Sequence, residues 1–258
     1  MTVHPEFAYV QARLQARHGG LPEPLAWQVL EASRTASHYL ALARSGPMAT
    51  WVEGLDDASD AHRIERHLRS RWRHYVDELS SWLPPRWQPA ARWFGRLSDL
   101  ALIDALQRGT HTARWLQRDE PLAAFAQPAP ELTGHAVRAA GLAALAGSRS
   151  PDARGRDGNI ATRWLDEWKR LLPADVADAA LLLRPAELLL PRLLGADNAR
   201  AAANESTRHA LLQLFRRHAA SAVAALAHLA LVALDVERLR GGLVARALFE
   251  VRPEPQAA

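Results

Sequence analysis

One stretch of the chain, residues 58–82, carries an apolar stripe with the period of an α-helix. The stripe residues follow one another at spacings of four, four, three and four: Ile64, Leu68, Trp72, Tyr75 and Leu79. Such spacings place the side chains on one helix face, which is stabilised when it is buried. Two consecutive prolines at 84 and 85 predict the end of the helix, because a proline disfavours the helical conformation of the residue before it. The sequence therefore predicts a long amphipathic helix.

The rest of the chain favours helices as well. We find no sustained alternation of β-branched and polar residues, and the helix formers Ala, Leu, Arg and Glu dominate. The predicted fold class is therefore all-α. Helices are expected near residues 6–18, 23–43, 58–82, 86–106, 111–118, 133–146, 160–172, 174–183, 185–193 and 206–249, with the last open to division into two helices.

A polar segment separates two helical regions. Residues 147–159 are rich in Gly, Ser and Arg and carry no apolar anchor, which is typical of a flexible linker. The prediction is an N-terminal helical lobe over 1–146 and a C-terminal helical lobe over 160–258. A single domain is the alternative, since a chain of 258 residues accommodates either arrangement.

Composition narrows the class of protein and its compartment. The chain contains no cysteine, which excludes disulfides, Cys-ligated zinc and thiol catalysis. Its longest apolar stretch, residues 219–234, is shorter than the roughly 20 residues of a membrane-spanning helix, so we expect a buried helix there. The N-terminus lacks the pattern of a signal peptide. We expect a cytoplasmic protein that reaches a membrane only through its partners, on the cytoplasmic face.

The basic residues are almost all arginine. Of the 32 lysines and arginines, only Lys169 is a lysine. A GC-rich genome explains this bias, and selection for bidentate contacts to carboxylate or phosphate is the alternative. Because the formal net charge is only +4, nucleic acid is an unlikely partner.

No motif predicts catalysis or a cofactor. The sequence HRIERH resembles a zinc-protease helix, but its histidines, His62 and His67, are five apart and therefore about 140° apart around a helix. A solvated polar face is the expectation for these histidines and for Glu65 between them. Phosphate-binding loops and nucleophile elbows are also missing from the sequence. We therefore predict no catalytic, cofactor-binding or metal-binding residues.

A compact charged cluster follows the apolar part of the last predicted helix. Its members are Asp235, Glu237, Arg238 and Arg240, and Gly241-Gly242 comes directly after it. Glu237 and Arg240 are three residues apart and are expected to pair. The cluster is either the polar exit of a buried helix or a surface that contacts a partner. These four residues are the predicted partner-binding positions.

Two segments of the chain resemble the C/d subunit family of V-type and A-type rotary ATPases. The first is residues 7–55, with Tyr9, Arg13, a leucine-rich helix and the Thr50-Trp51 turn. The second is the stretch from Glu237 to Gly241, which is similar to the "Glu, then Leu-Arg" part of the family's last long helix. This chain is shorter than a typical family member.

The resemblance implies a fold and a function. The fold is a set of helical lobes packed around a groove or funnel. The function is that of a non-catalytic connector, which couples the central shaft to the membrane ring in ion transport and binds protein subunits of that assembly. Charged residues that line the funnel would meet the shaft, and here Glu237 and Arg240 are the matching positions. The alternative is a helical regulatory module that binds protein or nucleic acid.

Overall fold

The protein is described here from a computed structural model. The described residues are 5–107, 116, 119, 122–123, 142–145, 159–176, 179–194 and 200–249. Within these ranges the chain forms helices and turns, with no β-strand, so the predicted all-α class is confirmed. None of the helices in these ranges combines the length and the apolar character needed to cross a bilayer.

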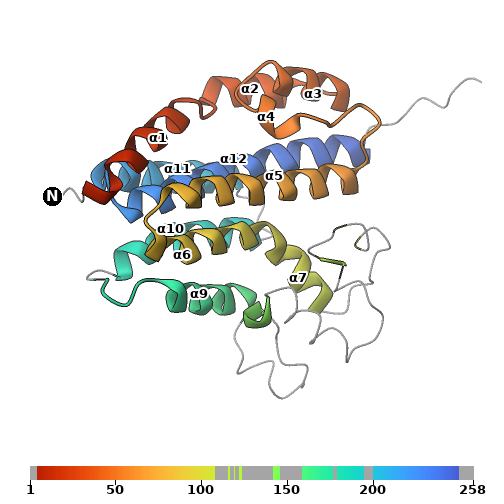
Figure 1. Ribbon diagram of the computed structural model, residues 1–258. Coiled ribbons are helices and arrows are strands. Elements are labelled where there is room, and N and C mark those ends of the chain that lie inside the picture. The colour runs from red at the N-terminus through yellow and green to blue at the C-terminus, as the bar shows by residue number, and fades with distance from the viewer. Residues whose placement is uncertain are drawn as a thin grey trace, which may run out of the picture.

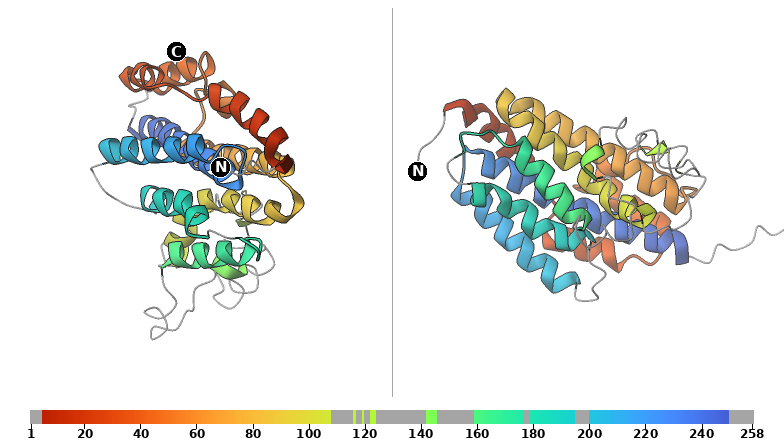
Figure 2. Two further views of the ribbon diagram at one scale, coloured as in Figure 1. Left: turned by 90° about the vertical axis from the view of Figure 1, so that its left-hand side faces the viewer. Right: turned by 90° about the horizontal axis from the view of Figure 1, so that it is seen from below.

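The α-helices stack in four layers (Figure 1). The first layer holds the N-terminal helices and the second holds the long stripe helix beside the last two helices. The third and fourth layers complete the stack, and the turned views show the same order (Figure 2). The bounds are α1 (Ala8–Gly19), α2 (Pro24–Ala32), α3 (Ala36–Arg44) and α4 (Ala49–Val52) in the first layer; α5 (Ala61–Trp82), α11 (Arg200–Arg217) and α12 (Ala222–Phe249) in the second; α6 (Gln88–Trp93), α7 (Leu100–Gln107) and α10 (Ala179–Leu194) in the third; and α9 (Ile160–Leu171) in the fourth.

Short 3-10 turns join some of these helices. They are η1 (Pro5–Phe7), η2 (Pro85–Trp87), η3 (Phe94–Asp99) and η6 (Ala143–Leu145). The predicted helix over 86–106 is therefore a succession of α and 3-10 turns. The predicted helices over 111–118 and 133–146 fall almost entirely outside the described residues.

Helix α5 forms as its stripe predicts. Asp60 caps its first turn, with the carboxylate accepting a hydrogen bond from the Arg63 backbone N–H at 2.7 Å, and this satisfies a donor that the helix leaves free. Leu68 and Trp72 are buried, and Leu83 is already extended before Pro84. The buried face of α5 meets α12 on one side and η3 on the other. One correction concerns Val76, which is fully buried although the predicted stripe omits it.

The single helix predicted over 23–43 is wrong. Two helices occupy this range, α2 and α3, because Ser33 takes an extended conformation and ends the first of them. The Thr35 hydroxyl then accepts a hydrogen bond from the His38 backbone N–H and begins the second. Ser and Thr bond readily to nearby backbone groups and so favour helix ends.

One other boundary differs from the prediction, and one division that the sequence left open is decided by the structure. The two helices expected near 174–193 are one helix, α10, which continues through Pro185; the buried side chains of Leu182, Ala186 and Leu189 hold it against its neighbours. The range 206–249 divides into α11 and α12 at a turn where Ala220 has a φ of 56°. The Ala220 backbone N–H donates to the Gln11 side-chain oxygen at 2.8 Å, which ties this turn to α1.

One hydrophobic core connects the layers. Buried side chains of α5, from the predicted N-terminal lobe, pack against those of α12, from the predicted C-terminal lobe. In α12, every residue from Ala222 to Val236 is buried. The predicted linker over 147–159 lies outside the described residues except for Asn159, which caps α9 by accepting from the Thr162 backbone N–H. The division into lobes stays a prediction.

Candidate functional site at the charged cluster of the last helix

The four predicted partner-binding residues lie on two different faces of α12. Asp235 and Arg238 face the first layer and α11, whereas Glu237 and Arg240 face α5. All four have partners within the chain. Their role in binding another protein stays a prediction, but the structure defines what each side chain contacts.

Asp235 is a buried residue, with 4% of its surface exposed. One of its carboxylate oxygens accepts a hydrogen bond from Arg208 Nη1 of α11 at 2.6 Å. Arg208 also donates to the backbone carbonyl of Pro22 at 3.1 Å, so the pair links α12, α11 and the start of α2. Burial raises the pKa of Asp235 to about 6, against the lowering effect of Arg208.

Arg238 joins α12 to α2. Its guanidinium donates to both carboxylate oxygens of Glu31, at 2.6 and 2.8 Å, and its central carbon lies 4.7 Å from the centre of the Trp27 ring. The pair with Glu31 raises the pKa of Arg238 above its usual value. Such a bidentate pair fixes orientation more firmly than a single contact does.

Further along the same helix, Arg246 and Gly242 complete the contact with the first layer. Arg246 donates to the carbonyls of Glu31 and Ser33, at 3.1 and 2.6 Å, and its guanidinium lies over the Tyr39 ring at 4.4 Å. Gly242 lies directly beneath Tyr39, where a Cβ atom would be 2.6 Å from Tyr39 Cζ. The end of α2, the first turn of α3 and the end of α12 therefore form one tightly fitted unit.

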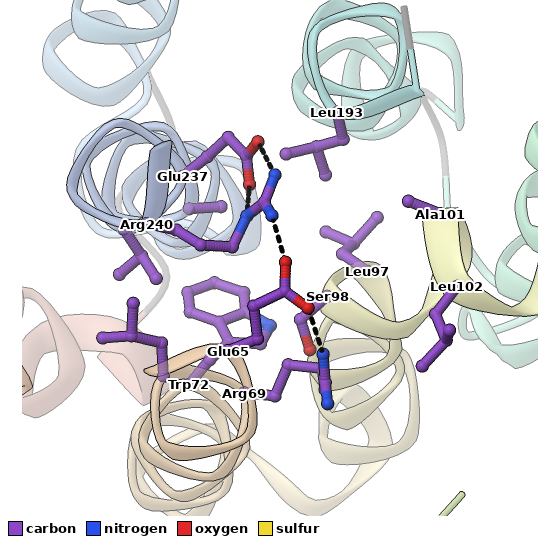
Figure 3. Close-up of a pocket in the computed structure, with 13 residues that line it drawn as sticks. Glu65, Arg69, Trp72, Leu97, Ser98, Ala101, Leu102, Leu193, Glu237 and Arg240 are labelled. Atoms are coloured by element: carbon purple, nitrogen blue, oxygen red, sulfur yellow. Dashed lines mark hydrogen bonds and ion pairs between the residues drawn. The ribbon is translucent and has the colours of Figure 1, made fainter. Parts of the chain in front are cut away.

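On the other face of α12, Glu237 and Arg240 pair as predicted. Arg240 Nη2 and Nε donate to the two carboxylate oxygens of Glu237 at 2.6 and 2.8 Å. Arg240 Nη1 also donates to Glu65 of α5 at 2.8 Å, as Figure 3 shows. The carboxylates of Glu237 and Glu65 raise the pKa of Arg240 above its usual value.

The pairing continues from Glu65 into the interior of the protein. Glu65 lies 3.7 Å from Arg69, the i, i+4 neighbour on α5, and Arg69 in turn donates to Asp119 at 2.6 Å. Arg73 lies 3.7 Å from Asp119 and 2.8 Å from Asp99. Because charges of opposite sign alternate along this chain of residues, each buried charge has a counter-charge beside it.

Glu65 and Arg240 lie at the edge of a pocket of about 260 Å³ between α5, α12, α10 and the η3–α7 segment (Figure 3). Charged side chains occupy one end, and the walls are mostly apolar, with Leu68, Trp72 and Leu97 among them. The sequence expectation of a solvated polar face for Glu65 is therefore wrong. The contact between Glu65 and Arg240 was not predicted from the sequence, because the two residues are 175 positions apart.

A second polar cluster lies buried where α1, α5, α11 and α12 meet. His228 of α12 is fully buried, and its Nε2 is 2.7 Å from the Tyr75 hydroxyl. The His18 ring stacks on Phe215 at 4.3 Å and lies 6.1 Å from the His228 ring. Burial lowers the pKa of His228 to about 3 and also lowers that of His18, so both imidazoles are neutral at physiological pH.

The histidines of HRIERH contact different surroundings. The His67 ring lies 3.1 Å from the Trp51 carbonyl oxygen, and His62 is exposed. In the part of the chain that the structure describes, no group of three or more His, Asp or Glu residues is arranged to hold a metal ion. No family model, no curated protein and no solved structure matches this chain.

Proposed function

We propose that this protein is a non-catalytic helical connector, similar to the rotary ATPase subunit that joins the central shaft to the membrane ring. One observation carries the proposal. The two segments with the family resemblance come from opposite ends of the chain, yet they contact each other through Glu31–Arg238, and Tyr39 of the first segment packs on Gly242, one residue past the second. A pattern split between distant segments gains weight when both contribute to one structural unit.

The outer face of this unit is suited to a protein partner. Leu25 and Val29 lie one turn apart on α2 and are 68% and 48% exposed, whereas Trp27 and Leu30 on the opposite face are buried. Exposed apolar side chains that share one helix face are typical of a surface that another protein covers. In the connector hypothesis, this face contacts another subunit of the assembly.

The arginines favour a protein partner over nucleic acid. Arg238 and Arg240 already pair with carboxylates of this chain, so a phosphate group would have to displace Glu31, Glu65 or Glu237. The alternative of a nucleic-acid-binding module predicts binding that weakens steeply with salt, because phosphate contacts release counterions. The connector hypothesis predicts no such binding.

Co-purification tests the proposal. The tagged full-length protein, expressed in its native host, is expected to co-purify with shaft or ring subunits of a rotary ATPase. Substituting Leu25→Ser and Val29→Ser together should reduce recovery of those subunits at least about tenfold, because two apolar side chains lose burial worth about 1.5 kcal/mol or more each. Leu248→Ser, at another exposed apolar position, is the matched control and should not reduce recovery. Recovery of no such subunit would refute the proposal.

A further inference from the structure

The pocket beside Glu65 and Arg240 has the features of a small-molecule site, which the connector function does not use. Its volume of about 260 Å³ exceeds the roughly 150 Å³ of apolar cavities that bind benzene. A water molecule in the liquid takes up about 30 Å³. At about the same volume for each non-hydrogen atom, the pocket holds about nine non-hydrogen atoms of a ligand. Its size therefore suits a ligand with one ring.

The pocket opens toward solvent on the side of α7. Ala101 is exposed there, and Leu102 of α7 and Leu193 of α10 are partly exposed beside it (Figure 3). Water in the apolar part of the pocket finds few polar partners, and an apolar ligand that displaces such water gains affinity. A ligand can therefore enter beside α7, and the release of poorly hydrogen-bonded water favours its binding.

The polar end of the pocket selects against a charged ligand. Both carboxylate oxygens of Glu237 accept from Arg240, and Arg240 also donates to Glu65. Arg69, the second arginine of the lining, pairs with the buried Asp119. A charged ligand would have to break one of these charge-assisted pairs or remain without a counter-charge in a partly buried site, and both are costly.

The remaining polar groups of the lining are also engaged. Trp72 Nε1 donates to the Phe94 carbonyl at 3.1 Å, and the Ser98 hydroxyl lies 3.4 Å from the Gly95 carbonyl oxygen. The lone pairs of the Glu65 carboxylate that do not accept from Arg240 remain able to accept a hydrogen bond from a hydroxyl or an N–H group of a neutral ligand. From this combination we propose that the pocket binds a small uncharged molecule with an aromatic or branched apolar body and one hydrogen-bonding group.

Binding of neutral and charged probes of the same shape tests the proposal. The probes are indole and benzyl alcohol, compared with benzoate and benzylammonium, each titrated into the purified full-length protein by isothermal calorimetry and by ligand-observed NMR. The neutral probes are expected to bind with dissociation constants on the order of 0.1–1 mM, as their size allows. The charged probes are expected to bind at least about tenfold more weakly.

Substitutions that fill part of the pocket test whether the probes bind there. Ala233→Leu, in the lining on α12, and Ala101→Leu, at the mouth, are each expected to weaken the neutral probes at least about fivefold, since both add volume where the ligand lies. Ala32→Leu, at an exposed helical alanine outside the lining, is the control and should leave binding unchanged. Because Ala101 is exposed, its variant keeps the test valid even if Ala233→Leu unfolds the protein.

Three results would overturn the proposal: no binding of either neutral probe at about 5 mM, equal or tighter binding of a charged probe, or unchanged binding in the Ala101→Leu variant. Each measurement uses the purified protein alone. A negative result in these binding measurements is therefore distinguishable from a failure to find a partner subunit by co-purification.

Discussion

The ring of Tyr39 lies against Gly242 so closely that no side chain fits at position 242. A Cβ atom there would be 2.6 Å from Tyr39 Cζ, a distance that real Cβ contacts do not show. Tyr39 itself is fully buried, and Arg246 covers its ring. The pair locks the first helical layer onto the last helix.

Gly242→Ala tests this fit. We expect the variant to lower the free energy of unfolding by about 1–3 kcal/mol, because overpacking forces the tyrosine or the backbone to shift. Gly241→Ala is the matched control: nothing lies within 4 Å of a Cβ there, so the change should raise stability by about 0.5–1 kcal/mol through helix propensity. Urea unfolding measures both. Equal effects of the two substitutions would contradict the close approach of Tyr39.

His228 makes stability depend on pH on the acidic side. Its pKa of about 3 in the folded protein lies below the usual 6.5, so its neutral form is favoured by folding. The stabilisation is complete above pH 6.5 and is lost as the pH falls toward 3. At about pH 5 the loss for this residue is about 2 kcal/mol.

His228→Gln isolates this contribution. The variant keeps a polar group near the Tyr75 hydroxyl but cannot be protonated. We expect its deficit in unfolding free energy, relative to the wild type, to shrink by about 2 kcal/mol between about pH 7 and pH 5, as measured by urea unfolding at both values. A deficit that stays constant with pH would mean that His228 is not buried as a neutral imidazole.

Asp235 makes stability depend on pH in the opposite sense from His228. Its pKa in the folded protein is about 6 rather than 3.8, so the stabilisation from its protonated form is complete below pH 3.8 and is lost as the pH rises through 6. Asp235→Asn keeps an acceptor for Arg208 and removes the charge. We expect the variant to be more stable by about 1–3 kcal/mol at about pH 8 and unchanged at about pH 4. Destabilisation at pH 8 would show that pairing with Arg208 outweighs the cost of burial.

Removing one partner of the Arg69–Asp119 pair is expected to lower the free energy of unfolding strongly. Replacing both partners with apolar residues is expected to lower it much less. Asp119→Ala leaves the buried Arg69 guanidinium without its closest counter-charge, with an expected loss of about 3–5 kcal/mol. The double substitution Arg69→Met and Asp119→Leu should recover at least about half of that loss, since neither position then holds a charge. Thermal or urea unfolding of both variants measures this. A double variant less stable than Asp119→Ala would contradict the expectation.

Helices with a clear local sequence pattern were predicted from the sequence. The stripe on α5 depends only on neighbouring residues, and it is confirmed. The break at Ser33–Thr35 was missed, although Ser and Thr favour helix ends and no large apolar side chain lies between Leu30 and Tyr39. The continuation of α10 through Pro185 is set by burial, which the sequence does not display.

The site was less predictable than the fold. The Glu237–Arg240 pair follows from a spacing of three, whereas its link to Glu65 depends on how α5 packs against α12. The opposite orientations of Asp235 and Glu237 have the same origin, since only the position of neighbouring layers decides what each side of α12 contacts. Tertiary packing, which no local pattern records, therefore determined the site.

Site-specific photocrosslinking tests the connector function most directly. A photoreactive amino acid replaces Leu25, on the exposed face of α2, in the full-length protein expressed in its native host, and Glu205, exposed on α11, is the control position. The connector hypothesis predicts a crosslink from position 25 to a shaft or ring subunit of a rotary ATPase and none from position 205. A crosslink from position 25 only to proteins outside such an assembly, or no crosslink at all, would contradict it.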